Sequence, residues 1–332
     1  MDKNYLISVI IPVHNTADYL SKCVDSVRNQ TLKDLEIILV ENMSTDTSAT
    51  LCDEYARIDS RIKVLHLPVA GLSIARNRGV QYASAPYIGF VDSDDYIAPT
   101  MYQEMLDALL KNQADLVYCN YFYERVDESL ESLDANTGKV ALKSRIDCLR
   151  EMMLEKISCS ACTKLFKKAF FESAFFPEGK FYEDRWVMHD WLMSCNRIVW
   201  VDKPLYYYVE RFTGICHTMT PINRYHFFLS EYARLEFVEK SGLFIGTELY
   251  ELRTFILKIC FSIFKEIMLI VKPGEFQELV LDMRHKIKAL SYMKRGEIDD
   301  HCYKKIKRIS NNWAIYYFIH FFMKRMLGRN TI

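Results

Sequence analysis

Three carboxylates lie within four residues, directly after an apolar run: IGFVDSDD at 88–95 ends in Asp92, Asp94 and Asp95. Like charges this close repel one another, so we expect a positive group among them. Mg²⁺ and Mn²⁺ prefer oxygen ligands and can bridge a carboxylate to a diphosphate. On an extended segment Asp92 and Asp94 would share one face, because alternate residues do. The alternative is an acidic helix cap, with Asp94 or Asp95 opening a helix near Pro99.

The elements that must position these carboxylates are visible as two alternating patterns over the first 125 residues. Short apolar runs, typical of buried strands, occur at Leu6–Val13, Leu35–Glu41, Ile62–Leu67, Tyr87–Asp92 and Leu116–Tyr121. Helical spacing lies between them, at Ala17–Asn29, Thr45–Arg57, Leu72–Ala83 and Pro99–Asn112. This alternation predicts an α/β fold in which a mostly parallel sheet carries helices on both faces.

Polar residues follow three of these predicted strands. They are Pro12-Val13-His14-Asn15, Glu41-Asn42 and the DSDD cluster. Ligands of parallel sheets bind beyond the carboxyl ends of the strands, so we expect the three segments to line one crevice.

The rest of the chain has two further parts. Residues 124–142 are polar and weakly patterned, which predicts a loop, and a helix near 144–156 and a strand near 198–201 follow. Helical patterns then dominate, at Tyr225–Ser241, Glu248–Val271, Glu275–Leu290 and Tyr303–Leu327. We predict an α/β domain over 1–220, with halves at about 1–123 and 124–220, and a helical C-terminal extension over 221–332.

Two common phosphate-binding signatures are missing from the sequence. The first predicted strand is followed by PVHNTADYL, which holds none of the glycines of a dinucleotide fingerprint and no P-loop. A nicotinamide enzyme and a P-loop enzyme are therefore disfavoured. Carboxylates acting through a metal ion remain as the means of holding a phosphate group.

The cysteines and the apolar runs bear on location. Ten cysteines are scattered, and Cys159-Ser-Ala-Cys162 is a lone CxxC without the second ligand pair of a zinc site. The apolar run at Leu6–Val13 is too short for a secretory signal, and no run reaches the roughly 18 residues of a membrane span. A reduced, cytoplasmic protein is the favoured interpretation, and we expect no nucleic acid partner.

Six ordered blocks of the chain resemble family 2 glycosyltransferases of bacteria. They are the opening at 8–46, GLSIARNRGV at 71–80, YIGFVDSDD at 87–95, TKLFKKAFF, FPEGKFYED and PLYYYVER. The resemblance covers about 5–215 and does not reach the helical extension. It implies the GT-A fold, a nucleoside diphosphate sugar as donor and inversion at the anomeric carbon. Residues 1–123 would then bind the nucleotide sugar and 124–220 the acceptor.

The resemblance also implies roles for single residues. Asp92-Ser93-Asp94 matches the DxD motif, so Asp94 would bind Mn²⁺ or Mg²⁺, and Asp92 would contact the ribose or a metal-bound water. Asp184, which ends the YED at 182–184, matches the general base. Arg76 matches a residue near the nucleotide, and Arg211 a cation beside the diphosphate. Inversion needs a base at the acceptor hydroxyl and charge stabilisation at the leaving group, and this set supplies both.

The segments that would border the nucleobase depart from the family pattern. Pro12 matches it, but His14 stands where tyrosine is common, followed by Asn15, and Glu41-Asn42-Met43-Ser44 replaces the usual Asp-Asp-Gly-Ser. An amide at Asn42 can donate as well as accept a hydrogen bond, so the base is less constrained. A uridine nucleotide remains the expectation.

We therefore expect a metal-dependent, inverting hexosyl- or N-acetylhexosaminyltransferase. It would move a sugar from a UDP-sugar to a hydroxyl of a glycan or lipid-linked saccharide, in the synthesis of a bacterial surface polysaccharide. The main alternative is a non-catalytic nucleotide-sugar-binding protein. A nucleotidyltransferase would want a glycine- and lysine-bearing loop after the first strand, which PVHNTADYL lacks.

The C-terminal residues are basic and aromatic. From Arg284 onward there are 12 Lys or Arg against 3 Asp or Glu, and residues 303–327 join a lysine cluster to NNWAIYYFIHFFMKRMLG. Cations flanking aromatic residues suit a helix lying in a membrane interface, here at the inner face of the plasma membrane. The alternative is a terminal helix docked on the catalytic domain or on a second subunit, which leaves a homo-oligomer open.

Overall fold

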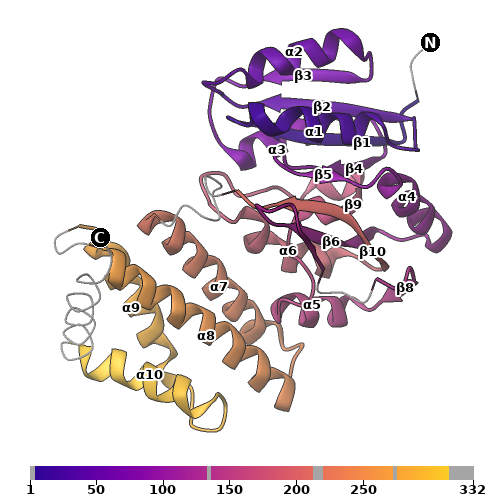
Figure 1. The fold of residues 1–332 in the computed structure, drawn as a ribbon. Coiled ribbons are helices and arrows are strands. Elements are labelled where there is room, and N and C mark those ends of the chain that lie inside the picture. The colour runs from indigo at the N-terminus through magenta and orange to yellow at the C-terminus, as the bar shows by residue number, and fades with distance from the viewer. Residues whose placement is uncertain (1–3, 133–135, 212–219, 272–274, 314–332) are drawn as a thin grey trace. The chain divides into compact units, whose positions relative to one another are not determined.

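The computed structural model describes residues 4–132, 136–211, 220–271 and 275–313 (Figure 1). The chain divides into two compact units, residues 1–212 and 213–332. The sequence placed this boundary at 220/221, and residues 213–219 between the two positions lie outside the described ranges.

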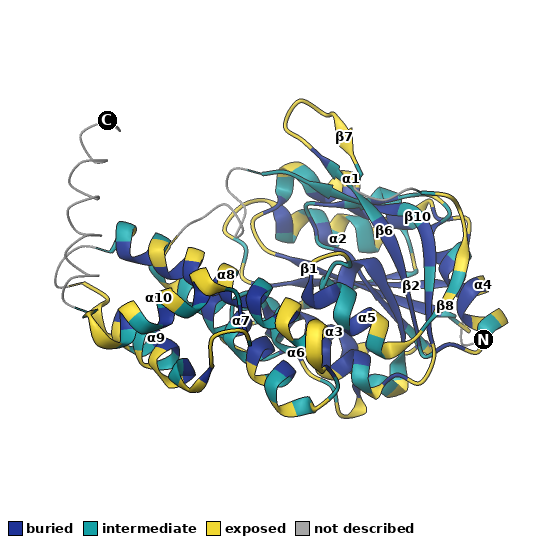
Figure 2. Ribbon diagram, turned by 90° about the horizontal axis from the view of Figure 1, so that it is seen from below, coloured by how far each residue is buried: buried dark blue, intermediate teal, exposed yellow. Residues whose placement is uncertain are grey.

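The first unit begins with a parallel sheet whose strands follow the order β3-β2-β1-β4. The strands are β1 (Ile7–Val13), β2 (Leu35–Glu41), β3 (Ile62–His66) and β4 (Tyr87–Phe90). The helices between and after them are α1 (Ala17–Arg28), α2 (Ser48–Ile58), α3 (Leu72–Tyr82) and α4 (Met101–Asn112). Every residue of β1 and β2 is buried, as Figure 2 shows in dark blue, because helices cover both faces of the sheet.

Beyond β4 the sheet is mixed, and its strands follow the order β4-β9-β6-β10-β5. The short strand β9 (Lys164–Lys167) is antiparallel to both β4 and β6 (Leu116–Glu124). β10 (Ile198–Val209) runs parallel to β6, and β5 (Tyr96–Ile97) lies at the edge. The predicted α/β class is confirmed, with its parallel part concentrated in the first half of the chain.

Several elements differ from the sequence-based expectation. The segment 124–142 contains two strands, β7 (Leu130–Glu131) and β8 (Val140–Lys143), where we expected only a loop. The predicted strand at 198–201 continues to Val209, through register shifts on both sides of Pro204. Proline has no N–H to donate to a neighbouring strand, which disfavours it inside a strand. Here β10 continues past Pro204, with an irregular register at that residue.

Residues 145–194 also form four helical elements, which precede and follow β9 in the chain. They are α5 (Arg145–Met153), the 3₁₀ turns η1 (Ala161–Thr163) and η2 (Lys168–Glu172), and α6 (Glu183–Ser194). η1 precedes β9 directly, and α6 begins with the Glu183-Asp184 pair.

Helix α3 packs against β1 and β2 at unusually close range. A Cβ at Gly79 would lie 2.4 Å from Ile10 Cγ2, so only glycine fits there without a shift of the strand. This approach places the N-terminal half of α3, including the buried Arg76, over the carboxyl ends of the strands.

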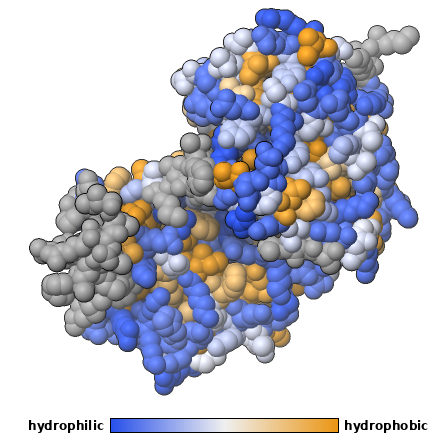
Figure 3. All heavy atoms as spheres, viewed as in Figure 1, coloured by the Kyte–Doolittle hydropathy of each residue, from blue (hydrophilic) through white to orange (hydrophobic). Residues whose placement is uncertain are grey.

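The second unit is helical, which confirms the predicted C-terminal extension. It contains α7 (Pro221–Ser241), α8 (Gly246–Ile270), α9 (Gln277–Ala289), η3 (Leu290–Tyr292) and α10 (Asp300–Asn311). α10 buries Cys302, Ile306 and Ile309, and hydrophilic residues cover the surface at its end of the unit (Figure 3). The expected helix at 303–327 is described only as far as residue 313, because 314–332 lie outside the described residues. Among the residues that the structure describes, no helix is long and apolar enough to cross a membrane.

Candidate active site

The DSDD cluster forms a tight turn after β4. The Asp95 N–H donates to Asp92 O at 3.0 Å, so the segment is not extended as we expected. Ser93 and Asp95 are buried, whereas the side chains of Asp92 and Asp94 are 31% and 24% exposed. Asp92 and Asp94, the two acidic residues of the DxD motif, therefore reach outward. Ser93 and Asp95 are buried and anchor the turn. Helix α4 begins at Met101, with Thr100 at its N-cap position, so neither Asp94 nor Asp95 opens it and the acidic-cap alternative was wrong.

Asp95 anchors the turn to β10. The Tyr206 hydroxyl donates to Asp95 Oδ2 at 2.5 Å, and the Val209 N–H donates to Asp95 Oδ1 at 2.8 Å. The same Tyr206 oxygen accepts the Asp92 N–H at 3.2 Å. Burial, followed by the charges of Asp94 and Asp92, raises the pKa of Asp95 well above its usual value. Asp95 thus holds the turn in place rather than facing a ligand.

The side chain of Arg76 connects the DSDD turn to the first turn of α6. Its Nη2 donates to Asp92 Oδ1 at 2.7 Å, and its Nη1 contacts both Glu183 and, at 3.3 Å, Asp184 Oδ1. The arginine side chain is only 2% exposed. The structure therefore places Arg76 beneath the carboxylates, where it neutralises part of their charge and holds Asp92 and Asp184 on one guanidinium.

Asp184 is held at both of its carboxylate oxygens. Arg76 contacts Oδ1, and the Ala161 N–H of η1 donates to Oδ2 at 3.2 Å. Burial raises the pKa of Asp184, and the charge of Arg76 opposes that rise. The side chain remains 13% exposed. A carboxylate with one partly exposed face and a raised pKa has the chemistry of a general base.

Glu183 is a functional neighbour that the sequence did not single out. It is buried beside Arg76, and burial raises its pKa to about 7. Its place next to Asp184 in the YED triplet was visible in the sequence. Its contact with an arginine 107 positions away was not, because that contact depends on the packing of α3 against α6.

Arg211 lies beside the second outward carboxylate. Its Nε is 2.8 Å from Asp94 Oδ2, an ionic contact without the alignment of a hydrogen bond. Its guanidinium carbon also lies 5.2 Å from the centre of the Tyr19 ring. Burial and then the charge of Asp92 raise the pKa of Asp94, so a further cation would be favourable here.

The end of β1 joins this turn through a hydrogen bond. The Thr16 hydroxyl donates to Ser93 Oγ at 2.9 Å, which brings the His14-Asn15 segment to the DSDD turn. His14 and Asn15 are exposed, whereas Pro12 is buried within β1. The two residues after β1 are thus the ones of this segment that a ligand can reach.

Glu41 and Asn42 are both buried and bonded within the protein. Glu41 accepts from the Ser44 N–H at 2.6 Å, and Asn42 Oδ1 accepts from the Gly71 N–H at 3.2 Å. The Asn42 main-chain oxygen meets His14 Nδ1 at 2.7 Å. Oδ1 accepts one hydrogen bond from Gly71, and the NH₂ group of Asn42 is its donor toward a ligand.

Divalent metal coordination would have to rest on few protein ligands. No group of three or more His, Cys, Asp or Glu arranged for a metal occurs within the described ranges. Mg²⁺ is often bound by one or two carboxylates together with substrate phosphates, and Asp92 and Asp94 suit that pattern. Each uses one oxygen for an arginine, at Arg76 and Arg211, and retains the other.

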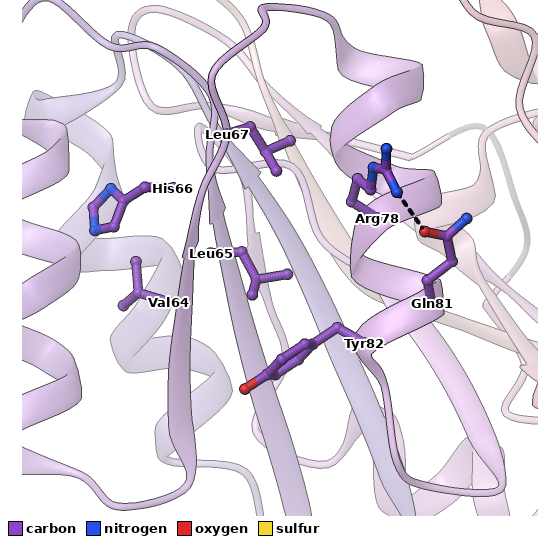
Figure 4. Close-up of a pocket in the computed structure, with 7 residues that line it drawn as sticks. All are labelled: Val64, Leu65, His66, Leu67, Arg78, Gln81 and Tyr82. Carbon is purple, nitrogen blue, oxygen red and sulfur yellow. Dashed lines mark hydrogen bonds between the residues drawn. The ribbon is translucent and has the colours of Figure 1, made fainter.

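A separate groove lies on the outer side of α3, against the edge strand β3 (Figure 4). It encloses about 420 Å³ and is lined by Val64, Leu65, His66, Leu67, Arg78, Gln81 and Tyr82. Arg78 is exposed and donates to Gln81, on the side of the helix away from the buried Arg76. The groove contains none of the carboxylates described above, so it is not the candidate site.

Solved structures with the same fold include S. aureus TarS. The crystal structure of residues 1–349 of TarS matches 86% of this chain and 80% of its own length, with a TM-score of 0.65 and 22% identity. The structure of TarS in complex with UDP-GlcNAc matches with a TM-score of 0.68 and 20% identity, over 86% of this chain and 81% of that one. At this identity the likeness establishes the fold, which is GT-A.

Sequence comparisons point the same way. GlyG of Streptococcus pneumoniae, a glycosyltransferase, is 33% identical over 64% of this chain and 73% of its own length. EpsJ of Bacillus subtilis, an uncharacterised glycosyltransferase, is 42% identical over 37% of this chain, and EpsH of the same organism, a putative one, is 34% identical over 50%. The chain spans only 36% and 48% of the lengths of these two. A sequence profile described as Glycosyl transferase family 2 matches residues 8–175. The chain belongs to glycosyltransferase family 2.

Proposed function

We propose that this chain is an inverting glycosyltransferase that uses a divalent metal ion and a UDP-sugar. The observation that carries the proposal is the Arg76 bridge. One guanidinium contacts both Asp92, of the DxD motif, and Asp184, the candidate base. A donor held at the DxD motif would therefore have its anomeric carbon close to the residue that activates the acceptor.

Asp184 is the proposed general base. Its carboxylate would take the proton of the acceptor hydroxyl while that oxygen attacks the anomeric carbon from the face opposite the diphosphate. Arg76 and the Ala161 N–H hold the two oxygens of this carboxylate and so fix its direction. The side chain is 13% exposed, so an acceptor hydroxyl group can reach it.

Asp94, with Asp92, is the proposed metal site. Bound Mn²⁺ or Mg²⁺ would supply charge neutralisation for the departing diphosphate. In the structure Arg211 contacts Asp94, so this arginine is placed to move from the carboxylate to a diphosphate oxygen when donor and metal bind. Arg211 would then neutralise part of the charge that develops on the leaving group.

The proposed donor is a UDP-sugar, and the TarS complexes with UDP and UDP-GlcNAc support it. The exposed His14 would stack on the base. The NH₂ group of Asn42 can donate to a carbonyl oxygen of uracil, although it cannot accept the imide N–H as a carboxylate would. A hexosyl or N-acetylhexosaminyl group would pass to a hydroxyl of a glycan or lipid-linked saccharide in the synthesis of a surface polysaccharide.

Nucleotide release from a panel of UDP- and GDP-sugars tests the donor and the metal together. With Mn²⁺ and no acceptor, we expect slow hydrolysis of a UDP-sugar by the wild type. Chelation should abolish it, and so should Asp94→Asn, which removes the metal-binding charge. The exposed Asp190→Asn, on α6, is the matched control and should hydrolyse the donor as the wild type does. Metal-independent donor binding without any hydrolysis would instead favour the non-catalytic alternative.

A further inference from the structure

Lys164 is a buried lysine in the catalytic unit, and the mechanism above does not use it. It opens β9 and is 1% exposed. Its ammonium donates to the main-chain oxygens of Ser158 and Ser160, both at 2.7 Å, and lies 3.4 Å from the Thr163 hydroxyl oxygen. Among the described residues no carboxylate forms an ion pair with it. Burying a lysine charge without a direct counter-ion is unfavourable. The hydrogen bonds from the ammonium to these oxygen atoms offset part of that cost.

The two carbonyl groups that Lys164 holds belong to the segment that carries η1. Ser160 caps η1 by accepting the Cys162 N–H at 3.1 Å. The N–H of Ala161, which follows Ser160 in the chain, donates to Asp184 Oδ2 at 3.2 Å. The ammonium therefore binds the carbonyl oxygen of the Ser160–Ala161 peptide unit, and the N–H of that same unit orients one oxygen of Asp184.

We propose that Lys164 is a positioning residue for Asp184, which it acts on through the segment 158–161. The inference rests on the proposed role of Asp184 as the base. Without the ammonium, two carbonyl groups would lose their donors, and the Ala161 N–H would no longer be held against Oδ2. The carboxylate would then be fixed only by Arg76, at Oδ1.

The charge of Lys164 acts in the same direction as its hydrogen bonds. The other charged or titratable groups that face Asp184 are Arg76 on α3, Asp92 after β4, Glu183 on α6 and Cys162 in η1. Burial and the charge of Asp92 raise the pKa of Asp184, whereas the charges of Arg76 and Lys164 lower it. Removing the lysine charge should therefore raise that pKa further.

Lys164→Met tests the proposal with the full chain and the donor identified by nucleotide release. We expect kcat to fall about 10- to 100-fold, because a small displacement of a base is costly, while the donor Kd changes by less than about twofold. The acid limb of the pH profile of kcat should move to higher pH. The matched control is Lys167→Met on the same strand, whose ammonium pairs with Asp115 at 2.9 Å at the surface, and it should leave both unchanged.

Ala161→Pro removes the N–H donor and keeps the lysine. Ser160 has φ −59° and ψ 135°, which a residue before proline readily adopts, and proline fits the first position of a helical turn. We expect a similar fall in kcat with a smaller shift of the acid limb, because the Lys164 charge remains. If Lys164→Met fails to fold, Ala161→Pro still tests whether the segment 158–161 orients Asp184.

A purely structural lysine would lower the melting temperature and leave the pH profile of the folded enzyme unchanged. Wild-type kcat and pH profile in Lys164→Met, or wild-type kcat in Ala161→Pro, would overturn the inference. Full activity in Asp184→Asn would instead overturn the proposed base. The two failures are therefore distinguishable.

Discussion

Arg76 shows at the scale of one residue how this site is held together. Its guanidinium meets Asp92, Glu183 and Asp184 from within the protein. Arginine has a planar fork of donors that stays protonated, whereas lysine offers a single compact charge. The geometry of the site therefore depends on the shape of this side chain as well as on its charge.

Arg76→Lys should accordingly preserve the charge and lose the bridge. We expect kcat to fall about 100-fold, because one ammonium cannot hold Asp92 and Asp184 together. The unfolding free energy should fall by about 2 kcal/mol, since buried carboxylates lose hydrogen-bond donors. Steady-state kinetics and urea unfolding measure both, and Arg78→Lys on the exposed side of the same helix is the control. Equal kcat values for the two variants would contradict the bridging role.

Because the pKa of Glu183 is raised in the folded protein, we expect the free energy of unfolding to depend on pH. Its pKa is about 7 in the folded protein, because of burial, against about 4.3 in an unfolded chain. The folded state thus binds the proton more tightly, and this contribution is complete below about pH 4.3 and lost as pH rises through 7. Relative to Glu183→Gln, wild-type stability should decline by about 1.4 kcal/mol per pH unit within that window. A difference that does not vary with pH would show that Glu183 is ionised throughout.

At the scale of elements, long periodic segments were predictable and short ones were not. β1, β2 and α1 to α4 lie where the apolar periodicity placed them, to within three residues at each end. β9 was missed because KLFK has four residues and a lysine at each end, and its place between β4 and β6 is set by pairing with distant strands. The contacts of Glu183 and Lys164 could not be predicted either, because they also depend on segments that are distant in the sequence. The carboxylates of the DSDD cluster and Asp184 were predicted from the sequence.

The start of the sheet contains a second buried network, at the end opposite the site. Glu36 on β2 accepts hydrogen bonds from Ser8 at 2.5 Å, from Lys63 at 2.5 Å and from the Ser84 N–H at 2.8 Å. Although burial opposes it, these bonds lower the pKa of Glu36. The network ties the segment after α3 to three strands of the parallel sheet.

Glu36→Gln should therefore destabilise the protein at neutral pH, by about 2 kcal/mol, because a buried acceptor loses its charge while three donors still point at it. The pKa of Glu36 is near 4.3 in the unfolded chain and lower in the folded protein. Its contribution to the free energy of unfolding is therefore complete above pH 4.3 and is lost as the pH falls through the pKa of the folded protein. Urea unfolding at pH 7 and pH 3 should show the difference between wild type and variant shrinking at the lower pH. The exposed Glu172→Gln is the control, and an equal difference at both pH values would contradict the account.

At the scale of the whole molecule, the catalytic unit and the helical unit have separate cores. In the helical unit α10 buries Cys302, Ile306 and Ile309, whereas Lys304 and Arg308 on the same helix are exposed. The predicted membrane contact over 303–327 stays a prediction, and its aromatic part beyond residue 313 lies outside the described ranges.

Flotation with liposomes containing anionic lipid tests that contact. We expect the full chain to float at low salt and a chain ending at 313 to remain at the bottom, since the truncation removes the aromatic segment and three basic residues while keeping α10. Circular dichroism of the shortened chain should confirm that its helices are retained. A full chain that fails to float would leave docking on protein as the role of the segment.

The proposed reaction requires Asp184 to act as a base beside a donor held at the DxD motif. The most direct test compares turnover and donor binding in Asp184→Asn, which keeps the shape of the side chain and removes its basicity. The account predicts a kcat lower by about 10²- to 10⁴-fold, with metal-dependent donor binding unchanged. Turnover close to that of the wild type would contradict it, because the proton of the acceptor would then be leaving by another route.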